Sequence, residues 1–228
     1  MKRVLIPELL DTDAGTPAEV KASLDDLRRI NRWFGGVSTT TDMVRNVARE
    51  IKASSMTLLE VAAGSGYVPA TARESLKSEG VKLSITLLDR SPSHLNGNDR
   101  TVAGNALALP LQDGSFDLVS CNLFAHHLDS DEFVTFAQEA LRVCRVAVLI
   151  NDLIRDPLHL ALVYAGLPLY RSRLTRHDAR ASVGRSYTVQ EMRAMLAHTS
   201  AARVEIRRHY LFRMGVIAWK MNLNKVGS

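Results

Sequence analysis

The feature that most constrains the fold is an apolar run at residues 56–61, which carries Glu60 near its end and leads into a glycine-rich turn at residues 62–66. A helical pattern begins just after the turn, near Val68. A strand, a tight turn and a helix in this order place backbone N–H groups at a helix N-terminus, where the helix dipole favours an anionic ligand group. The segment therefore predicts a strand–turn–helix unit that holds a ligand.

Strand-like and helical segments alternate along the rest of the chain. The expected strands are residues 56–61, 81–89, 100–106, 116–122 and 143–150, followed by two runs at 202–209 and 212–220. Helical patterns lie between them, at residues 68–78 and from residue 129 or 130 onwards. Such alternation favours parallel pairing and right-handed crossovers. We expect an α/β fold: a doubly wound, mostly parallel sheet of about seven strands, with helices on both faces and an antiparallel C-terminal edge pair.

Helices are also expected outside this alternation. Thr16-Pro17-Ala18-Glu19 is a capping-box start, and an apolar stripe follows with a period of three to four residues, as far as a stop at Gly35-Gly36. The stripe consists of Val20, Leu24, Leu27, Ile30 and Phe34. A second helix is expected after residues 38–41, a third within 157–170 and another from Thr188.

We interpret residues 1–228 as a single domain. Its expected parts are an N-terminal helical cap (1–53), a core that carries the ligand-binding turn (54–152), a helical and basic insertion (153–199) and the terminal strand pair (200–220).

Composition narrows the function only weakly. The chain has 228 residues and a formal net charge of +5, which suits anionic small molecules, acidic surfaces or nucleic acid alike. Cys121 and Cys144 lie in apolar segments without the spacing of a metal site or a disulfide framework. The apolar run at the start is too short for a signal peptide or a membrane span. A soluble, cytoplasmic protein without a bound metal is the expectation.

Polar groups follow three of the expected strands. Glu60 and the turn follow the first, Asp89 ends the second, and Asn105 follows the third. Ligands of doubly wound sheets bind beyond the carboxyl ends of the strands, beside the first strand. There a carboxylate can accept both hydroxyls of a ribose, and an amide can hydrogen-bond an adenine edge.

These motifs together resemble the class I S-adenosylmethionine-dependent methyltransferases over residues 56–152. The family's acidic-x-Gly-x-Gly-x-Gly loop appears as Glu60 to Gly66 with alanine at the first glycine, and Gly-Asp-Ala appears as Gly104-Asn105-Ala106. Residues 109–119 look like the family's stretch before the fourth strand. The resemblance implies S-adenosylmethionine as cofactor, S-adenosylhomocysteine as product, and these cofactor-binding residues: Glu60, Ala62, Ala63, Gly64, Ser65, Gly66, Asp89, Arg90, Asn105, Ala106, Asn122 and Leu123.

The sequence departs from the family's motifs at two positions, and one other cofactor class fits part of the pattern. Alanine at position 62 is tolerated if its φ is negative, and Asn105 keeps a hydrogen-bonding group but lacks the family's charge. A nicotinamide dinucleotide fold also fits Gly64-Ser65-Gly66 followed by Asp89. However, Pro69 occupies the place of the third glycine of that fingerprint, which favours the methyl donor.

Residues for the acceptor are weaker candidates. His126 and His127 follow the fourth strand and could take a proton from the acceptor, although packing is the commoner role for such histidines. Arg171, Arg173, Arg176 and His177 in the insertion could hold an anionic or carrier-bound acceptor, and a solvated basic loop is as good an interpretation. Trp33 and Phe34 could form an aromatic lid, although core aromatics at a helix end are commoner.

The hypothesis is a metal-independent small-molecule methyltransferase. A weaker resemblance, carried by residues 27–33 and 172–178, is to bacterial methyltransferases of polyketide or quinone pathways, which implies secondary metabolism and O-methylation of a phenol or hydroxyquinone. Carbon methylation of an aromatic ring is the sister alternative. An RNA methyltransferase and a cofactor-binding subunit without turnover also stay open, and the sequence allows a homodimer.

Overall fold

The computed structural model describes residues 1–10, 15–90 and 99–220, which fold around a seven-stranded sheet. The strand order is β3-β2-β1-β4-β5-β7-β6, in which β7 alone runs antiparallel to its neighbours β5 and β6. The strands are β1 (Ser55–Val61), β2 (Lys82–Asp89), β3 (Arg100–Ala103), β4 (Phe116–Asn122), β5 (Cys144–Leu153), β6 (Arg203–His209) and β7 (Arg213–Trp219). The expected doubly wound sheet with an antiparallel edge pair is confirmed.

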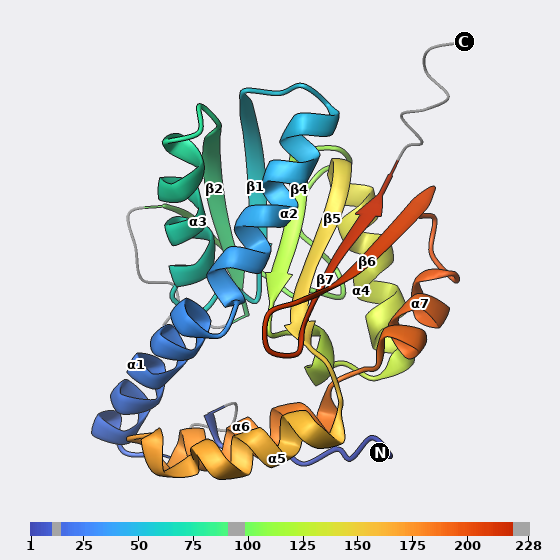
Figure 1. The fold of residues 1–228 in the computed structure, drawn as a ribbon. Helices are drawn as coiled ribbons and strands as arrows, with labels where there is room; N and C mark the ends of the chain where they lie inside the picture. Colours follow the sequence, from blue (N-terminus) through green and yellow to red (C-terminus); the bar gives the residue numbers. More distant parts are fainter. Residues whose placement is uncertain (11–14, 91–98, 221–228) are drawn as a thin grey trace.

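Helices cover both faces of the sheet (Figure 1). They are α1 (Pro17–Trp33), α2 (Gly36–Glu50), α3 (Tyr67–Lys77), α4 (Ser130–Val143), α5 (Pro157–Gly166), α6 (Arg173–Arg185) and α7 (Val189–Leu196), with short 3₁₀ turns η3 (Ala125–His127) and η4 (Leu167–Leu169). On one face α2 and α3 pack Met43, Val47 and Leu76 against the sheet. On the other face α4 and α7 pack Phe133 and Met192. Two apolar layers therefore hold the strands, so that the strand ends can carry polar groups.

Several boundaries differ from those expected from the sequence. Helix α2 begins at Gly36 rather than after residues 38–41, because Gly35 turns the chain with a φ of 81° and leaves Gly36 free to start the helix. Strand β3 ends at Ala103, where Asn105 starts a local turn, and β5 continues to Leu153 because β7 pairs with it that far. Residues 173–185 form the helix α6 rather than a loop, with Ser172 as its N-cap.

Helix α1 buries a different face from the one its apolar stripe predicts. Its buried residues are Ser23, Asp26 and Asn31, whereas Leu24 and Phe34 are exposed. The helix expected from the stripe is present, but the stripe itself is only partly buried. The polar face is buried because α6 and the strand ends offer it hydrogen-bond partners that local sequence cannot reveal.

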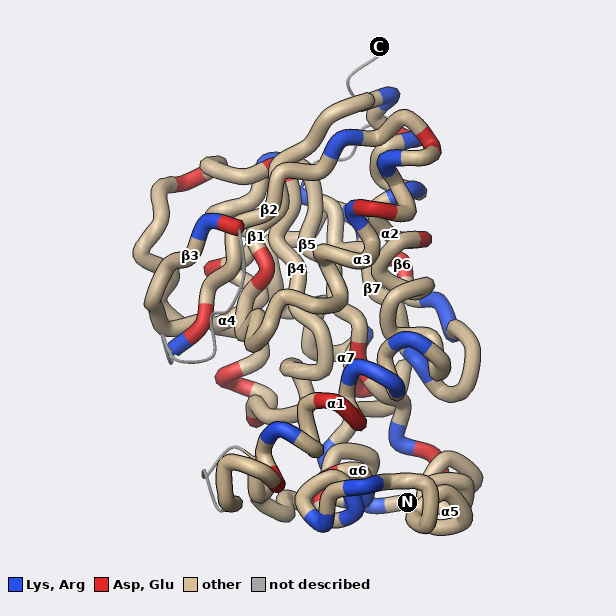
Figure 2. The backbone as a smooth tube through the Cα atoms, turned by 90° about the vertical axis from the view of Figure 1, so that its left-hand side faces the viewer, with Lys and Arg blue, Asp and Glu red and all other residues tan. Residues whose placement is uncertain are grey.

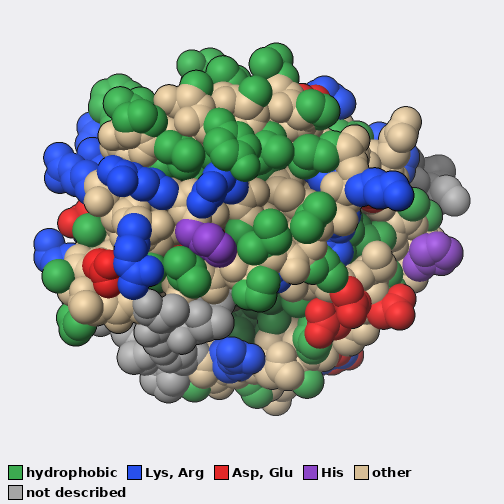
Figure 3. All heavy atoms as spheres, turned by 90° about the horizontal axis from the view of Figure 1, so that it is seen from below, with side chains coloured by type: hydrophobic (Ala, Val, Ile, Leu, Met, Phe, Trp, Pro, Cys, Tyr) green, Lys and Arg blue, Asp and Glu red, His purple; other side chains and the backbone are tan. Residues whose placement is uncertain are grey.

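Helices α5 and α6 lie beneath the carboxyl ends of β1, β4 and β5, and the N-terminal segment runs beside them (Figure 1). From below, hydrophobic side chains spread across this end of the molecule with Lys and Arg side chains among them (Figure 3). The exposed apolar residues of these segments and of η4 include Leu5, Leu158, Leu162 and Leu169. Among the described residues, no helix combines the length and apolar character that a membrane crossing needs.

Candidate cofactor and acceptor site

The glycine-rich turn is shaped by three residues in the left-handed backbone region. Ala62, Gly64 and Gly66 have φ values of 53°, 49° and 64°. A Cβ at Gly66 would lie 2.6 Å from Leu87 Cδ1, so only glycine fits there, whereas a Cβ at Gly64 would meet no atom within 4 Å. The loop thus packs against β2 at one glycine and keeps open space at the other.

Ala62 does not meet the condition under which alanine is tolerated at this position, which is a negative φ. Its φ is positive, so an alanine at the position of the family's first glycine is strained rather than relaxed. The chain keeps this conformation because neighbouring loop residues are fixed: Ala63 N donates to Leu88 O at 3.0 Å and Gly66 N donates to Ala63 O at 2.9 Å. The strain does not open the loop.

Two carboxylates stand beside this loop, at the adjoining carboxyl ends of β1 and β2. Asp89 Oδ2 accepts the backbone N–H of Gly64 at 2.9 Å, which holds the carboxylate against the loop. Glu60 is fully buried, and that burial raises its pKa to about 7 despite hydrogen bonds from Ser120 and Asn122 that lower it. A buried carboxylate of this kind is stabilised by a cation placed next to it.

A chain of hydrogen bonds extends from Glu60 across the strand ends. Asn122 donates to Glu60 Oε1 at 2.6 Å, and Thr40 Oγ1 donates to Asn122 Oδ1 at 2.8 Å. Asn151 Nδ2 donates in turn to Thr40 Oγ1 at 2.9 Å. These contacts tie β1, β4 and β5 to the first turns of α2, so the position of Glu60 depends on four elements.

The far end of this chain is the buried guanidinium of Arg213. It donates to Asn31 Oδ1 at 2.9 Å and to Phe34 O at 3.3 Å. Burial lowers the pKa of Arg213 to about 10. The junction of α1 and α2 is thereby fixed at the same edge as the carboxylates.

The remaining residues implied for the cofactor have less distinctive surroundings. Asn105 is exposed, and its Oδ1 accepts the backbone N–H of Leu107 at 3.0 Å, a turn that uses its oxygen for the local backbone. Arg90 is exposed, next to residues outside the described ranges. Leu123 follows β4 with a φ of 52° and donates its N–H to Asn151 O at 2.9 Å. Ser65 and Ala106 are half-buried.

His126 lies between two carboxylates. Its Nδ1 is 2.7 Å from Asp152 Oδ1 and its Nε2 is 3.2 Å from Glu8 Oε1. Burial works against a positive charge there, but Asp152 and Glu8 outweigh it and raise the pKa of His126 to about 9. Both nitrogens are therefore engaged, which favours a structural role over proton abstraction. His127 Nε2 is 3.8 Å from Glu8 Oε1 and its side chain is partly exposed.

The residues expected at the acceptor are spread over two helices. Trp33 and Phe34 are exposed at the end of α1, with the Arg32 guanidinium 5.7 Å from the Trp33 ring centre. On α6, Arg173 pairs with Glu19 of α1 at 2.5 Å, and His177 Nδ1 lies 2.9 Å from Asp178 Oδ1.

Arg171 and Arg176 are exposed, and Figure 2 shows the basic residues of α6 at the lower end of the molecule. The structure thus brings the carboxylates and the loop together, and leaves Arg176 on an outer helix with Arg171 just before it.

Sequence reasoning missed several buried polar residues of this edge: Glu8, Thr40, Ser120, Asn151 and Asp152. One signal was available, because Asn151-Asp152 ends a nearly continuous apolar strand, as Asp89 does. Glu8 gave no such signal, since its partner His126 is 118 residues away.

Comparisons with known proteins agree with this geometry. A family model described as a methyltransferase domain matches residues 59–149, from β1 into β5. No curated protein sequence matches the chain significantly.

Solved structures show the same fold. A plantazolicin methyltransferase in complex with S-adenosylhomocysteine is 13% identical, with a TM-score of 0.71 over 94% of this chain and 95% of that one. The methyltransferase (CMeT) domain of a citrinin polyketide synthase is 13% identical, with a TM-score of 0.54 over 74% of this chain and 47% of that one. A methyltransferase from Methanosarcina mazei is 17% identical, with a TM-score of 0.53 over 78% and 97%.

The matched segment contains the loop, both carboxylates, the end of β1 and the whole of β2. Residues 59–149 thus match a methyltransferase domain, and the chain shares the fold of solved methyltransferases.

Proposed function

We propose that this protein transfers a methyl group from S-adenosylmethionine to a hydroxyl group of a small, largely apolar acceptor. The observation that carries the proposal is the convergence of Glu60, Asp89 and the Gly64–Gly66 turn at the adjoining ends of β1 and β2. The open space at Gly64 and the two carboxylates fit a ligand with a ribose and an ammonium group.

The cofactor would supply a methyl group already activated on a sulfonium, so the protein's work is alignment and exclusion of water. In this proposal Asp89, oriented by Gly64, accepts the ribose hydroxyls, and Glu60 faces the ammonium group. Asn122 holds the Glu60 carboxylate in place. Asn105 presents its amide to the adenine edge from the turn after β3.

The acceptor class is inferred from the surfaces around the strand ends. The half-exposed apolar stripe of α1, together with Trp33 and Phe34, offers an apolar wall that the core does not use. Arg171 and Arg176 are exposed and would bind an anionic group of the acceptor or of a carrier. Structures of the plantazolicin methyltransferase include complexes with desmethyl plantazolicin analogues, which supports a natural-product acceptor for this chain too. A phenol, hydroxyquinone or polyketide is the class we favour.

Calorimetry with S-adenosylhomocysteine tests the cofactor site. The wild type should bind it, and Asp89→Ala should weaken binding about 10- to 150-fold, the equivalent of about 1.5–3 kcal/mol for a hydrogen bond to a charged group. Asp113→Ala, which removes an exposed carboxylate paired with Arg142, is the control and should bind like the wild type. If the wild type does not bind S-adenosylhomocysteine, or if Asp89→Ala binds it equally well, the proposed cofactor site is refuted. Binding of a nicotinamide dinucleotide instead would favour the alternative in which this turn holds that cofactor.

Turnover assays with S-adenosylmethionine and a panel of phenols, hydroxyquinones and electron-rich rings test the acceptor. A methyl group found by mass spectrometry on oxygen supports the proposal, and one found on ring carbon selects the sister reaction. Tight cofactor binding without turnover on any acceptor would favour a non-enzymatic subunit. Methylation of RNA with steeply salt-dependent binding would replace the small-molecule acceptor.

A further inference from the structure

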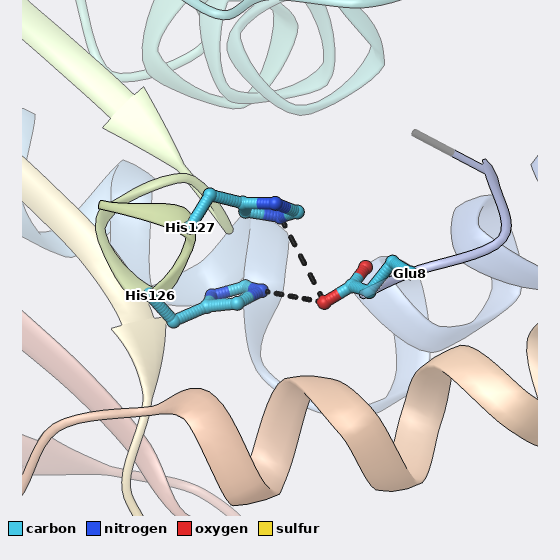
Figure 4. Close-up of side chains that lie close together, drawn as sticks. All are labelled: Glu8, His126 and His127. Carbon is cyan, nitrogen blue, oxygen red and sulfur yellow. Dashed lines mark hydrogen bonds and ion pairs between the residues drawn. The ribbon is translucent and has the colours of Figure 1, made fainter. Parts of the chain in front are cut away.

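Three potential metal ligands meet below the end of β4 (Figure 4). Glu8 comes from the N-terminal segment, and His126 and His127 come from η3. Glu8 Oε1 is 3.2 Å from His126 Nε2 and 3.8 Å from His127 Nε2, and the three ligand atoms all lie within 4.8 Å of one another. An ion placed between them could reach all three with small shifts of the side chains, since Zn–N and Zn–O bonds are about 2.0–2.2 Å long.

Neighbouring residues orient two of the three potential ligands, His126 and Glu8. Asp152 Oδ1 accepts from His126 Nδ1 at 2.7 Å, and Asp152 Oδ2 accepts the backbone N–H of His126 at 2.9 Å. This leaves Nε2 directed at Glu8. Ser182 of α6 donates to Glu8 Oε1 at 2.7 Å. A carboxylate behind a ligating histidine is the usual arrangement at metal sites, where it fixes the tautomer and the direction of the ring.

The charge of the cluster favours a cation. Glu8 and Asp152 place two carboxylates around His126, and all three side chains are nearly buried, with exposed fractions of 11%, 2% and 2%. Buried carboxylates require a partner charge, which a metal ion would supply when His126 ligates it as a neutral imidazole. The position between Glu8 and the two imidazoles is thus where a positive charge is best stabilised.

We propose that Glu8, His126 and His127 bind one divalent transition-metal ion of the Zn²⁺ class, with Asp152 as the positioning residue of His126. Two imidazole nitrogens and one carboxylate oxygen form a ligand set that Zn²⁺ accepts, and three protein ligands leave a further position for water or another oxygen. The partial exposure of His127, 20%, gives that position a route to solvent.

The bound ion would link the N-terminal segment to η3, next to α6. Arg3 of the N-terminal segment already donates to the carbonyls of His126 and Leu128. Ligation and proton abstraction by the same imidazoles exclude each other, and the convergence of Glu8 on both rings favours ligation. The inference does not depend on the proposed methyl transfer.

Metal titrations of the full chain test the site. The protein is stripped with a chelator and titrated with Zn²⁺ by calorimetry and with Co²⁺ by visible absorption. We expect one ion per chain and the d–d bands of low-coordinate Co²⁺. Glu8→Gln and His127→Ala should abolish both signals, and Asp152→Asn should weaken binding about 10- to 100-fold. His198→Ala, which replaces a histidine beyond the end of α7, is the control and should leave them unchanged.

Thermal melts of the metal-free variants show which of them are folded. Glu8→Gln preserves the side-chain volume, so its metal binding tests the site even if His127→Ala does not fold. Absence of stoichiometric binding by the wild type would overturn the site and leave His126 as a protonated link between two carboxylates. Unchanged binding by both Glu8→Gln and His127→Ala would place the ion elsewhere and overturn it equally.

Discussion

Ala62 holds a left-handed backbone conformation, with a φ of 53°, at the start of the glycine-rich turn. An L-residue with a Cβ is strained there by about 1–2 kcal/mol. The neighbouring Ala63 does not have a positive φ, so only one of these two adjacent alanines is strained.

Replacing Ala62 by glycine should stabilise the protein by about 0.5–1 kcal/mol, because relief of strain exceeds the added entropy of the unfolded chain. Ala63→Gly is the matched control and should destabilise it by about 0.5–1 kcal/mol. Urea unfolding of both variants measures the two signs. Equal signs would contradict the strain at Ala62.

Glu60 links stability to pH. Burial raises its pKa from 4.5 to about 7, so the native state holds this proton more tightly than the unfolded chain does. The stabilisation that results is complete below pH 4.5 and is lost as the pH rises through 7. The free energy of unfolding of the wild type, relative to Glu60→Gln, should therefore fall by about 2.5 kcal/mol between pH 5 and 8. Urea unfolding at both pH values gives this difference, and a constant difference would contradict the buried, protonated carboxyl.

At the scale of elements, helix starts are encoded locally. Thr16, Asp129 and Thr188 each form a capping box with a glutamate three residues later, as the sequence pattern of the first and third predicts. Asp129 begins α4, whose Phe133 and Phe136 fill the core on one face of the sheet. The cap thus fixes where a core helix starts.

Asp129→Ala should cost about 1 kcal/mol, because the N–H groups of Asp131 and Glu132 lose their acceptor. Asp129→Asn keeps an acceptor and should stay within a few tenths of a kcal/mol of the wild type. Chemical denaturation of the two variants separates the cap from the loss of charge. A larger loss in Asp129→Asn than in Asp129→Ala would contradict the capping role.

Across the whole molecule, α1 is held by residues distant in sequence. Asp26 accepts the backbone N–H groups of Arg171 at 2.8 Å and Ser172 at 3.0 Å, just before α6. Ser23 Oγ lies 3.0 Å from Thr175 Oγ1 on α6. These contacts turn the apolar stripe of α1 away from a core position and fix the helix beneath the strand ends.

Asp26→Ala should destabilise the protein by about 2–3 kcal/mol, because the N–H groups of Arg171 and Ser172 lose a charged acceptor. Asp25→Ala, which removes an exposed carboxylate one residue away, should change stability by less than about 0.5 kcal/mol. Both values come from urea unfolding. Equal losses would show that α1 is not held through Asp26.

The sequence by itself determined the sheet, its helices and the loop. Each of these follows from local patterns: strand-forming apolar runs, capping boxes and glycines in tight turns. The shared location of Glu60 and Asp89 was also predictable, because parallel strands bring their carboxyl ends to one edge. The two carboxylates lie at neighbouring strand ends in the fold as a result.

Only the tertiary structure decided which face of α1 is buried, the sign of φ at Ala62 and the partners of His126. Glu8 and Asp152 approach His126 from 118 and 26 residues away. Such contacts depend on where whole elements dock, and the period of a sequence contains no information about a partner on another element. A buried polar side chain can therefore be recognised as part of a site only when the fold shows which groups form hydrogen bonds with it.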